Sequence, residues 1–332
     1  MIIKHNVQLQ PYNSFRTKAL AKIFCEPRGT DELIEVIKTH PDEKKLILGA
    51  GFNLFFTKDF DGLVIRPVME EINTISEDDN HAEIEVEAGM EWDTFVQRCV
   101  ERGYSGIENL SLIPGSVGAS PIQNIGAYGT EVSETITRVK TVDLKSGDLK
   151  SFSNEECRFG YRDSIFKHQA GQVIASVTFR LSKSFEYKEK YIDLSRELNG
   201  TPRPSLEQVR EAIIRIRTRK LPDFRELPNA GSFFKNPILT KEEKENLLKK
   251  AVDAPVYNAG KNRFKTSAAY LIDKAGYKGK RRGMVGTYEH HSLVIVNHGT
   301  EDGREIVAFM KEVQQEVMKQ FGVRLDPEVR IY

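Results

Sequence analysis

Residues 111–129 read SLIPGSVGASPIQNIGAYG. This stretch holds four glycines and two prolines, and small residues fill many of its other positions. It is too apolar for a disordered linker and too rich in glycine and proline for a regular helix or strand. A long ordered loop inside a compact domain is usually functional, so this stretch is the first candidate for a binding site.

A second glycine-rich segment lies earlier in the chain. Residues 46–48 read LIL, which predicts a buried strand, and Gly49-Ala50-Gly51-Phe52-Asn53 follows it as a tight turn. The turn is not GxGxxG and lacks the GK[ST] of a P-loop, so on its own it favours an ordinary turn. Two glycine-rich segments together can surround a diphosphate with backbone N–H groups alone, because glycine permits positive φ and close approach.

The N-terminal half is expected to mix strands with short helices. Thr30 is expected to cap a short helix that has Leu33, Ile34 and Ile37 on one face. An apolar helical repeat predicts a second helix, which ends at Gly103 and carries Trp92 into the core. The members of this repeat are Trp92, Phe95, Val96, Cys99 and Val100. The expected strands span 46–48, 62–67, 82–88, 138–143 and 173–181.

A polar stretch at 183–205, which contains Pro202 and Pro204, marks the predicted main domain boundary. The helices expected beyond it span 206–221, 240–251, 267–276 and 306–321, and Gly322 closes the last. Strands are expected at 292–297 and 323–332. The C-terminal part is therefore a second region with both helices and strands.

Composition excludes several classes of protein. The 332 residues carry 49 Lys and Arg against 48 Asp and Glu, a net charge of +1 that argues against a basic nucleic-acid binder. No apolar run approaches the roughly 18 residues of a membrane span, and residues 1–6 lack the apolar core of a secretory signal. Cys25, Cys99 and Cys157 form no CxxC, which favours reduced thiols. We expect a soluble, cytoplasmic, multi-domain protein.

Two charged segments have more than one interpretation. Between Cys157 and Lys167, Arg158 and Arg162 flank aromatic residues, which fits either a surface turn or a clamp for a carboxylate or phosphate. The chain ends in Asp326-Pro327-Glu328-Val329-Arg330-Ile331-Tyr332, which fits an edge strand with a surface ion pair or a strand that supplies a site residue.

Asn229-Ala230-Gly231-Ser232 resembles a nucleophile turn only in part. The second glycine of GxSxG is replaced by Phe234, so a serine hydrolase is poorly supported. A serine hydroxyl can instead donate a proton to a carbanion. The seven histidines, His290 and His291 included, show no metal-ligand spacing, and no metal is expected.

Eight segments, in order along nearly the whole chain, resemble the UDP-N-acetylenolpyruvoylglucosamine reductase family of peptidoglycan precursor synthesis. The segments are Asn13–Thr17, Gly49–Leu54, Ile113–Gly118, Pro121–Gly129, Gly160–Ser164, Ala230–Pro237, Leu271–Asp273 with Gly276, and Pro327–Arg330. The region around Tyr187 and Tyr191 resembles the long form of the family, in which a tyrosine loop covers the substrate.

The resemblance implies an α+β fold. The implied fold has an FAD-binding domain of the vanillyl-alcohol-oxidase (PCMH) type at about 15–183, within two subdomains at 1–70 and 71–205. A substrate domain follows at 206–332, and its last strand returns to the active site. It implies non-covalent FAD, NADPH as reductant, and UDP-N-acetylglucosamine enolpyruvate as substrate. The product would be UDP-N-acetylmuramate. A monomer is expected, with no nucleic-acid or membrane partner.

The resemblance also implies roles for residues. The catalytic residues would be Arg162, Ser232 and Glu328. Substrate contacts would be Tyr161, Arg162, Tyr191, Lys220, Asn236, Tyr257, Lys278 and His291. Flavin contacts would be Gly49, Ala50, Gly51, Phe52, Asn53, Leu54, Pro114, Gly115, Ser116, Gly118, Ala119, Ser120, Asn124, Gly126, Ala127, Tyr128 and Gly129. Phe52 departs from the serine usual in the family, which removes a hydroxyl contact to the diphosphate and leaves the backbone N–H groups.

The implied chemistry agrees with these residue types. A hydride from the N5 atom of reduced FAD would reach the outer carbon (C3) of the enolpyruvyl group, and the charge that develops needs a fixed cation, which Arg162 supplies. Ser232 would protonate the inner carbon (C2). Two alternatives remain: another flavin oxidase or dehydrogenase on the same fold, which would not need the serine, and a non-catalytic nucleotide-sugar binder, which would carry no flavin.

Overall fold

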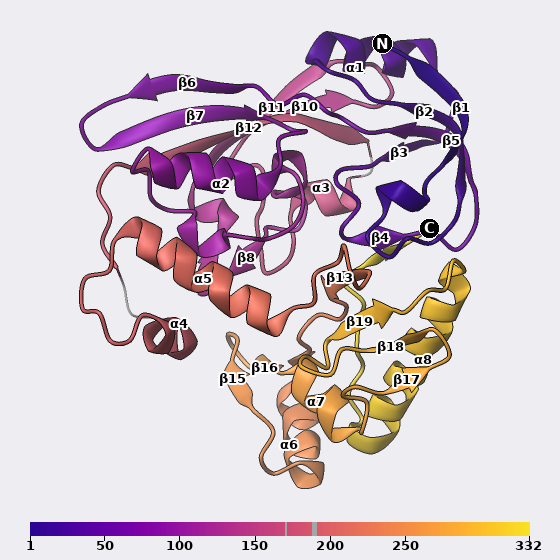
Figure 1. The fold of residues 1–332 in the computed structure, drawn as a ribbon, viewed down its shortest axis with the longest axis vertical. Coiled ribbons are helices and arrows are strands. Elements are labelled where there is room, and N and C mark those ends of the chain that lie inside the picture. Colours follow the sequence, from indigo (N-terminus) through magenta and orange to yellow (C-terminus); the bar gives the residue numbers. More distant parts are fainter. Residues whose placement is uncertain (170, 188–190) are drawn as a thin grey trace. The chain divides into compact units, whose positions relative to one another are not determined.

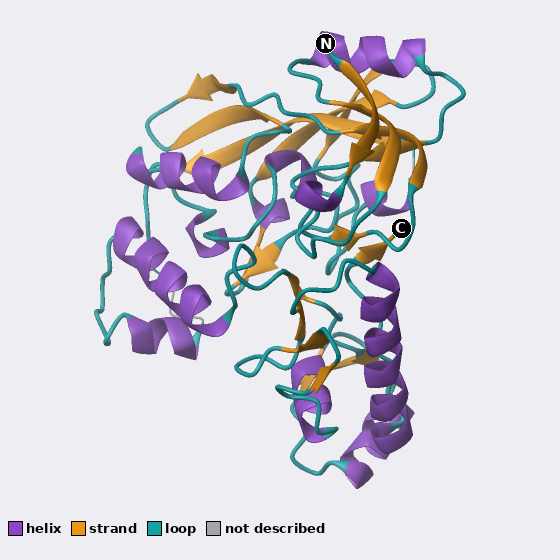
Figure 2. Ribbon diagram, turned by 45° about the vertical axis from the view of Figure 1, so that its right-hand side comes forward, coloured by secondary structure: helices purple, strands orange, loops and turns teal. Residues whose placement is uncertain are grey.

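The computed structural model describes residues 1–169, 171–187 and 191–332. These residues form two compact units. Unit 1 comprises Met1–Val7, Ala21–Ala50 and Phe60–Arg217, and unit 2 comprises Gln8–Leu20, Gly51–Asp59 and Thr218–Tyr332. Each unit contains both helices and strands (Figure 2), so the α+β class expected from the sequence is confirmed.

The first sheet of unit 1 has four strands in the order β1-β2-β5-β3, and its β2–β5 and β5–β3 pairs are parallel. The strands are β1 (Ile3–Gln8), β2 (Leu20–Cys25), β3 (Lys45–Ile47) and β5 (Phe60–Ile65). Helix α1 (Thr30–Thr39) connects β2 to β3 and buries Leu33, Val36 and Ile37. The predicted cap at Thr30 is wrong, because Thr30 is the first residue of the helix and Gly29 is its N-cap, without a side-chain hydrogen bond.

The second sheet of unit 1 is antiparallel, in the order β11-β10-β12-β7-β6. Its strands are β6 (Ile72–Glu77), β7 (His81–Glu87), β10 (Ile136–Asp143), β11 (Leu149–Ser153) and β12 (Gln172–Ser182). Helix α2 (Trp92–Glu101) lies beneath this sheet in Figure 1 and packs Trp92 and Phe95 against Phe179, with ring centroids 6.0 and 4.9 Å away. The predicted helix and the core position of Trp92 are confirmed.

The glycine-rich stretch forms an ordered loop of short elements, as predicted. The loop itself contains η3 (Val117–Ala119) and β8 (Gly126–Ala127). It is bordered by η2 (Glu108–Leu110) before it and by β9 (Thr130–Glu131) and η4 (Val132–Glu134) after it. The short helix α3 (Ile165–His168) follows later in unit 1. Trp92 supports the start of the loop, because its indole N–H donates to the carbonyl oxygen of Leu110 at 2.9 Å.

Unit 2 contains a sheet in the order β13-β19-β18-β17, a smaller sheet in the order β14-β16-β15, and the parallel pair β4–β20. Its strands are β4 (Leu54–Phe55), β13 (Asn229–Ser232), β14 (Ile238–Leu239), β15 (Val256–Asn258), β16 (Phe264–Thr266), β17 (Arg281–Arg282), β18 (Val285–Thr287), β19 (Val294–Asn297) and β20 (Arg330–Ile331). Its helices are η1 (Gln10–Tyr12), α6 (Lys241–Lys250), α7 (Ala268–Lys274) and α8 (Gly303–Phe321).

Helix α8 follows the periodicity of the sequence. Asp302 caps its first turn by accepting from the N–H of Arg304, and Gly322 ends it in the left-handed conformation at φ 72°. The buried face of α8 includes Ile306, Met310, Val313, Val317 and Phe321, which are the residues from which the sequence predicted the helix.

The final strand is shorter than predicted. The sequence indicated 323–332, but β20 covers Arg330–Ile331, preceded by a single bridge between Phe234 and Pro327. The partner strand β4 is two residues long, and Pro327 has no N–H to donate, so a longer ladder cannot form there.

The boundary between the units also differs from the prediction at residue 205. Helices α4 (Ile192–Glu197) and α5 (Leu206–Lys220) share an apolar cluster, in which Leu194 and Leu198 meet Val209 and Ile213. This contact keeps α5 in unit 1 as far as Arg217. No helix among the described residues is long and apolar enough to cross a membrane.

Two N-terminal segments belong to unit 2, although the sequence prediction assigned residues 1–70 to one subdomain. The side-chain amide of Asn297 donates to the carbonyl oxygen of Phe15 at 2.7 Å. A Cβ on Gly303 would lie 2.0 Å from the carbonyl oxygen of Phe56, so glycine is required where α8 meets the segment Gly51–Asp59. Asn297 and Phe15 are almost 300 positions apart in the sequence, and Gly303 and Phe56 are almost 250 apart.

Candidate functional site

The two glycine-rich segments predicted to hold a diphosphate meet in unit 1. A Cβ on Gly49 would lie 3.0 Å from the hydroxyl oxygen of Ser116 and 3.7 Å from the Cβ of Ala119. The turn after β3 therefore packs directly against η3. Ala50 ends this part of unit 1, and the rest of the first segment, Gly51–Leu54, belongs to unit 2.

The second glycine segment is held closely against the end of β7. Gly118 donates to the carbonyl oxygen of Ala88 at 2.9 Å, and Val117 donates to that of Met90 at 2.8 Å. A Cβ on Gly118 would lie 2.5 Å from the Cβ of Ala88, so a larger residue cannot fit without displacing the loop. Ser120, at 1% exposure, closes the turn through its hydroxyl, which donates to the carbonyl oxygen of Val117 at 2.7 Å.

The same loop concentrates unusual backbone conformations. Gly115 has φ 141° with open space around the position of a Cβ, so backbone geometry and not crowding calls for glycine there. Leu112, Asn124 and Tyr128 have φ values of 57°, 46° and 49° although they are not glycine. Strained backbone of this kind clusters at ligand sites, and successive turned N–H groups form concave sites for anions.

Arg162 lies against this loop. Its Nη2 donates to the carbonyl oxygen of Gly126 at 2.5 Å and its Nη1 to that of Asn124 at 3.4 Å. Its guanidinium carbon is 5.4 Å from the ring centroid of Tyr161, which is 42% exposed. The guanidinium thus lies beside the glycine loop and is held by its carbonyl oxygens, and the anion clamp at residues 157–167 stays a prediction.

Tyr191 also lies beside the glycine loop. Its ring meets the ring of Tyr128 edge to face, with centroids 5.7 Å apart, and 46% of Tyr191 is exposed. Tyr191 is the N-cap residue of α4. Residues 188–190 of the predicted tyrosine loop lie outside the described residues. Unit 1 therefore gathers Arg162, Tyr161, Tyr128 and Tyr191 around one loop.

In unit 2, Ser232 and Glu328 lie on neighbouring segments. The N–H of Glu328 donates to the carbonyl oxygen of Phe233 at 2.8 Å, and the N–H of Lys235 donates to that of Asp326 at 2.9 Å. Ser232 is exposed, whereas Phe233 and Phe234 after it are buried at 0% and 1% exposure. The two residues therefore come from adjacent backbones, and the serine hydroxyl is accessible.

A bulge in β13 accounts for the exposed serine. The register between β13 and β19 shifts between Asn229 and Ser232, and Gly231 has φ 66°. The side-chain oxygen of Asn229, which is 4% exposed, accepts from the N–H of Gly231 at 2.8 Å and fixes the turn. Bulges of this kind re-aim side chains, and here the bulge precedes Ser232.

The unit 2 part of the first glycine segment borders Glu328. The side-chain amide of Asn53 donates to the carbonyl oxygen of Glu328 at 3.3 Å, and the N–H of Arg330 donates to the carbonyl oxygen of Asn53 at 3.0 Å. Leu54 pairs with Arg330 between β4 and β20. The last strand thus returns to the glycine segment within unit 2.

Phe52 has an aromatic partner that the sequence analysis did not anticipate. Its ring meets Phe224 edge to face, with centroids 4.4 Å apart. Nothing in the local sequence pattern connects the two residues, which are more than 170 positions apart. Phe52 thus contributes to packing through its ring.

The predicted substrate cations of unit 2 influence one another. Burial lowers the pKa of His291 below its ordinary value, and the ammonium groups of Lys220 and Lys278 lower it further. The Nδ1 atom of His291 accepts from the N–H of Leu293 at 3.3 Å. The positive charges that Lys220 and Lys278 bring to His291 are compatible with the predicted phosphate contact.

The other two predicted substrate contacts of unit 2 differ in setting. Asn236 accepts from the N–H of Ala268 through its side-chain oxygen at 3.0 Å, which ties it to the start of α7. Tyr257, in β15, is 62% exposed.

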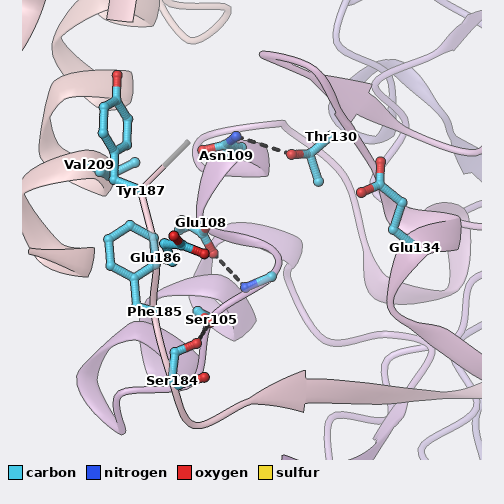
Figure 3. Close-up of a pocket in the computed structure, with 11 residues that line it drawn as sticks. Ser105, Glu108, Asn109, Thr130, Glu134, Ser184, Phe185, Glu186, Tyr187 and Val209 are labelled. Atoms are coloured by element: carbon cyan, nitrogen blue, oxygen red, sulfur yellow. Dashed lines mark hydrogen bonds between the residues drawn. The ribbon is translucent and has the colours of Figure 1, made fainter. Parts of the chain in front are cut away.

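Unit 1 also contains a polar cavity of about 350 Å³ (Figure 3). It lies beside η2, β9 and the segment at 184–187, and its lining includes Glu108, Asn109, Thr130 and Glu134. Burial raises the pKa of Glu108. The residues that line this cavity do not include any predicted flavin, substrate or catalytic residue.

Three comparisons relate the chain to known proteins. Residues 223–332 match the model of the UDP-N-acetylenolpyruvoylglucosamine reductase C-terminal domain, and residues 21–153 match that of an FAD binding domain. Proteins named UDP-N-acetylenolpyruvoylglucosamine reductase are 42% identical to this chain in Flavobacterium johnsoniae, over 100% of both chains, and 42% identical in Chromobacterium violaceum, over 97% of both.

A solved structure shows the same fold. The crystal structure of UDP-N-acetylenolpyruvylglucosamine reductase from Thermus caldophilus aligns with a TM-score of 0.71, at 22% identity, over 100% of this chain and 99% of that one. The FAD-binding domain expected from the sequence is confirmed. Because the chain is 42% identical to these two relatives over 97–100% of its length, it belongs to the UDP-N-acetylenolpyruvoylglucosamine reductase family, whose members are oxidoreductases.

Proposed function

We propose that this chain uses NADPH to reduce UDP-N-acetylglucosamine enolpyruvate to UDP-N-acetylmuramate, with FAD as its resident cofactor. Family membership supports the reductase activity, and the FAD-binding domain supports the cofactor. NADPH as reductant, the monomeric state and the cytoplasmic location remain predictions from the sequence.

The glycine loop suits a flavin diphosphate. Gly49, Gly115 and Gly118 would surround it, because side chains at Gly49 and Gly118 would push the two segments out of place and Gly115 has a backbone conformation that favours glycine. The remaining predicted flavin contacts, Pro114, Ala119, Gly126, Ala127 and Gly129, belong to the same loop. A bound flavin supplies a hydride to the outer carbon (C3) of the enolpyruvyl group.

Arg162 and Glu328 would stabilise the charge that develops on the substrate carboxylate. Hydride addition makes the inner carbon and its carboxylate electron-rich, and an enclosed dianion needs a fixed cation. Arg162 is fixed by two carbonyl oxygens of the glycine loop, which supports this role. Glu328, when protonated, would donate a hydrogen bond to the same carboxylate oxygens.

Ser232 would protonate the inner carbon (C2). A carbanion is basic enough to take a proton from an alcohol, and water or a lysine can restore the hydroxyl proton. The bulge at Ala230–Gly231 and the exposure of Ser232 support this assignment. Hydride and proton together saturate the double bond, so the atoms and charges balance.

Lys220, Lys278 and His291 would bind the diphosphate of the substrate. Burial and the ammonium groups of Lys220 and Lys278 lower the pKa of His291, and the positive charge of the two lysines supports an anion site there. Tyr161, Tyr191, Asn236 and Tyr257 would supply further contacts to the sugar nucleotide.

The observation that carries the proposal is the hydrogen bond from Glu328 to Phe233, which keeps the two candidate catalytic residues of unit 2 on adjacent backbones. The experiment is an absorbance spectrum of the purified protein. We expect an oxidised flavin spectrum that NADPH bleaches and that UDP-N-acetylglucosamine enolpyruvate restores. A colourless protein after gentle purification, or a reduced flavin that this substrate does not reoxidise, would overturn the proposal.

A further inference from the structure

The turn that carries Arg162 is closed by its own backbone. The N–H of Gly160 donates to the carbonyl oxygen of Asp163 at 3.0 Å, and the N–H of Asp163 donates back to that of Gly160 at 3.1 Å. Arg162 itself has φ 54°, a left-handed conformation that is unfavourable for a long side chain. Such a conformation persists only where the surroundings hold it.

Asn124 provides that hold from the glycine loop. It is 1% exposed, and its Nδ2 donates to the carbonyl oxygen of Gly160 at 3.1 Å and to Glu131 Oε2 at 2.8 Å. Its Oδ1 accepts from the N–H of Ser133 at 3.0 Å. These contacts occupy both N–H donors of the amide and one site on its oxygen.

Asn124 also touches the other end of the arginine. Its carbonyl oxygen accepts from Arg162 Nη1, and the carbonyl oxygen two residues later, on Gly126, accepts from Nη2. One residue therefore anchors the base of the turn with its side chain and helps to hold the guanidinium with its backbone. A third connection lies close by, where the hydroxyl of Ser164, at 1% exposure, donates to the carbonyl oxygen of Ile122 at 2.7 Å.

We propose that Asn124 is a positioning residue for Arg162, with Ser164 as a second anchor, and that it acts through the arginine instead of contacting the flavin with its side chain. The sequence predicted Asn124 as a flavin contact, but its amide N–H donors are directed to Gly160 and Glu131. The inference rests on the proposed role of Arg162. Its consequence is that loss of the Asn124 amide displaces the guanidinium and slows the step in which Arg162 takes part.

The test uses the flavin-loaded enzyme and measures two half-reactions separately, flavin reduction by NADPH and reoxidation by UDP-N-acetylglucosamine enolpyruvate. We expect Asn124→Ala to slow reoxidation about 10- to 100-fold, the range for a displacement of about 1 Å in a catalytic group, and to leave flavin reduction within about twofold. In an Arg162→Lys background, the same change should slow reoxidation by less than about threefold, because residues that act as a unit are non-additive.

The matched control is Asn154→Ala. Asn154 donates to the carbonyl oxygens of Ser133 and Ile136 at 2.8 and 2.7 Å, so its removal loosens the same neighbourhood without touching the arginine turn. We expect both half-reactions of this variant to match the unmodified enzyme. Equal slowing in Asn154→Ala and Asn124→Ala would overturn the inference, because general loosening would then explain both.

A further variant covers the case in which Asn124→Ala does not fold or hold flavin. Ser164→Ala removes one hydrogen bond at the other anchor, and we expect the same selective slowing of reoxidation, by about three- to tenfold for one lost hydrogen bond. Normal reoxidation in every anchor variant that holds flavin, or full additivity with Arg162→Lys, would overturn the positioning role alone. Near-normal turnover of Arg162→Lys itself would instead overturn the proposed role of the arginine, and the inference with it.

Discussion

The backbone N–H of Glu328 donates to the carbonyl oxygen of Phe233 across 2.8 Å. Phe233 follows Ser232 directly, so this bond holds Glu328 beside the segment that carries Ser232. The proposed reaction needs both residues. Because the bond is made by main-chain atoms, the Glu328 side chain can be changed while the connection is kept.

Glu328→Ala is therefore expected to fold normally and to lose activity. Removal of the whole carboxyl group takes away a hydrogen-bond donor that faces the developing charge, and kcat should fall by about 10²- to 10³-fold, as for other lost donors of this kind. Steady-state kinetics measures the effect. Asp326→Ala, two residues earlier and exposed beside Arg324, is the control and should retain normal kcat. Similar kcat values for the two variants would remove Glu328 from the active site.

Gly118→Val tests the glycine cradle. A Cβ at this position would lie 2.5 Å from the Cβ of Ala88, so the loop must move away from β7. We expect flavin affinity to fall by about 5- to 150-fold, since overpacking costs about 1–3 kcal/mol. Flavin content and titration with FAD measure the effect. Gly29→Ala, where a Cβ meets nothing within 4 Å, should bind FAD normally. Tight FAD binding by Gly118→Val would refute the cradle.

Phe52→Ser restores the residue usual at this position in the related family. It removes the edge-to-face contact with Phe224, and such aromatic pairs contribute about 0.5–1.5 kcal/mol beyond their buried area. We expect a lower free energy of unfolding. FAD affinity should change by less than about threefold if, as proposed, backbone groups and not side chains of this segment bind the diphosphate. Denaturant unfolding of Phe52→Ser, Phe224→Leu and the double variant should show coupling between the two sites. Strict additivity would show that the pair contributes nothing of its own.

Asp93 and Arg210 give unit 1 a pH-dependent stability. Asp93 Oδ1 and Oδ2 accept from Arg210 Nη1 and Nη2 at 2.7 and 2.9 Å, and Oδ1 also accepts from the N–H of Leu112 at the start of the glycine loop. Burial alone would raise the pKa of Asp93, but Arg210 and the Leu112 N–H outweigh it and lower the pKa below the ordinary value.

A lowered pKa in the folded state stabilises the fold above the unfolded pKa of about 3.9, and this stabilisation is lost as pH falls through the folded pKa. We expect Asp93→Asn to lower the free energy of unfolding at pH 7 by about 3 kcal/mol, as for other broken buried pairs. The difference from the unmodified protein should shrink as the pH falls below about 4. Urea unfolding at a series of pH values measures it, and a difference independent of pH would contradict the assignment.

Elements with a regular apolar repeat were predictable from the sequence. Helices α2 and α8 formed where buried residues recur at helical spacing and a glycine follows, because local packing and capping decide these elements. The short β20 was not predictable, since its length depends on β4, a two-residue partner more than 270 positions away. The place of Phe15 in unit 2 was not predictable either, since its carbonyl oxygen accepts from the side-chain amide of Asn297, which lies far along the chain.

The site was predictable in part. Glycine spacing pointed to the loop at 111–129, and the structure packs it against Gly49. The roles of Arg162, Ser232 and Glu328 came from resemblance to a family, because nothing in local spacing connects them. The side-chain contacts of Asn124 reach Gly160, 36 positions away, and the pairing of Phe52 with Phe224 spans a still greater separation. Such contacts have no local signature.

The most direct test of the proposed chemistry is a stopped-flow measurement on Ser232→Ala. The enzyme is reduced with NADPH, mixed with UDP-N-acetylglucosamine enolpyruvate, and followed by flavin absorbance. We predict that flavin reduction keeps its normal rate and that reoxidation slows by at least about 10²-fold, because the carbanion lacks its proton donor. Equal slowing of both half-reactions, or unchanged reoxidation, would contradict the role of Ser232.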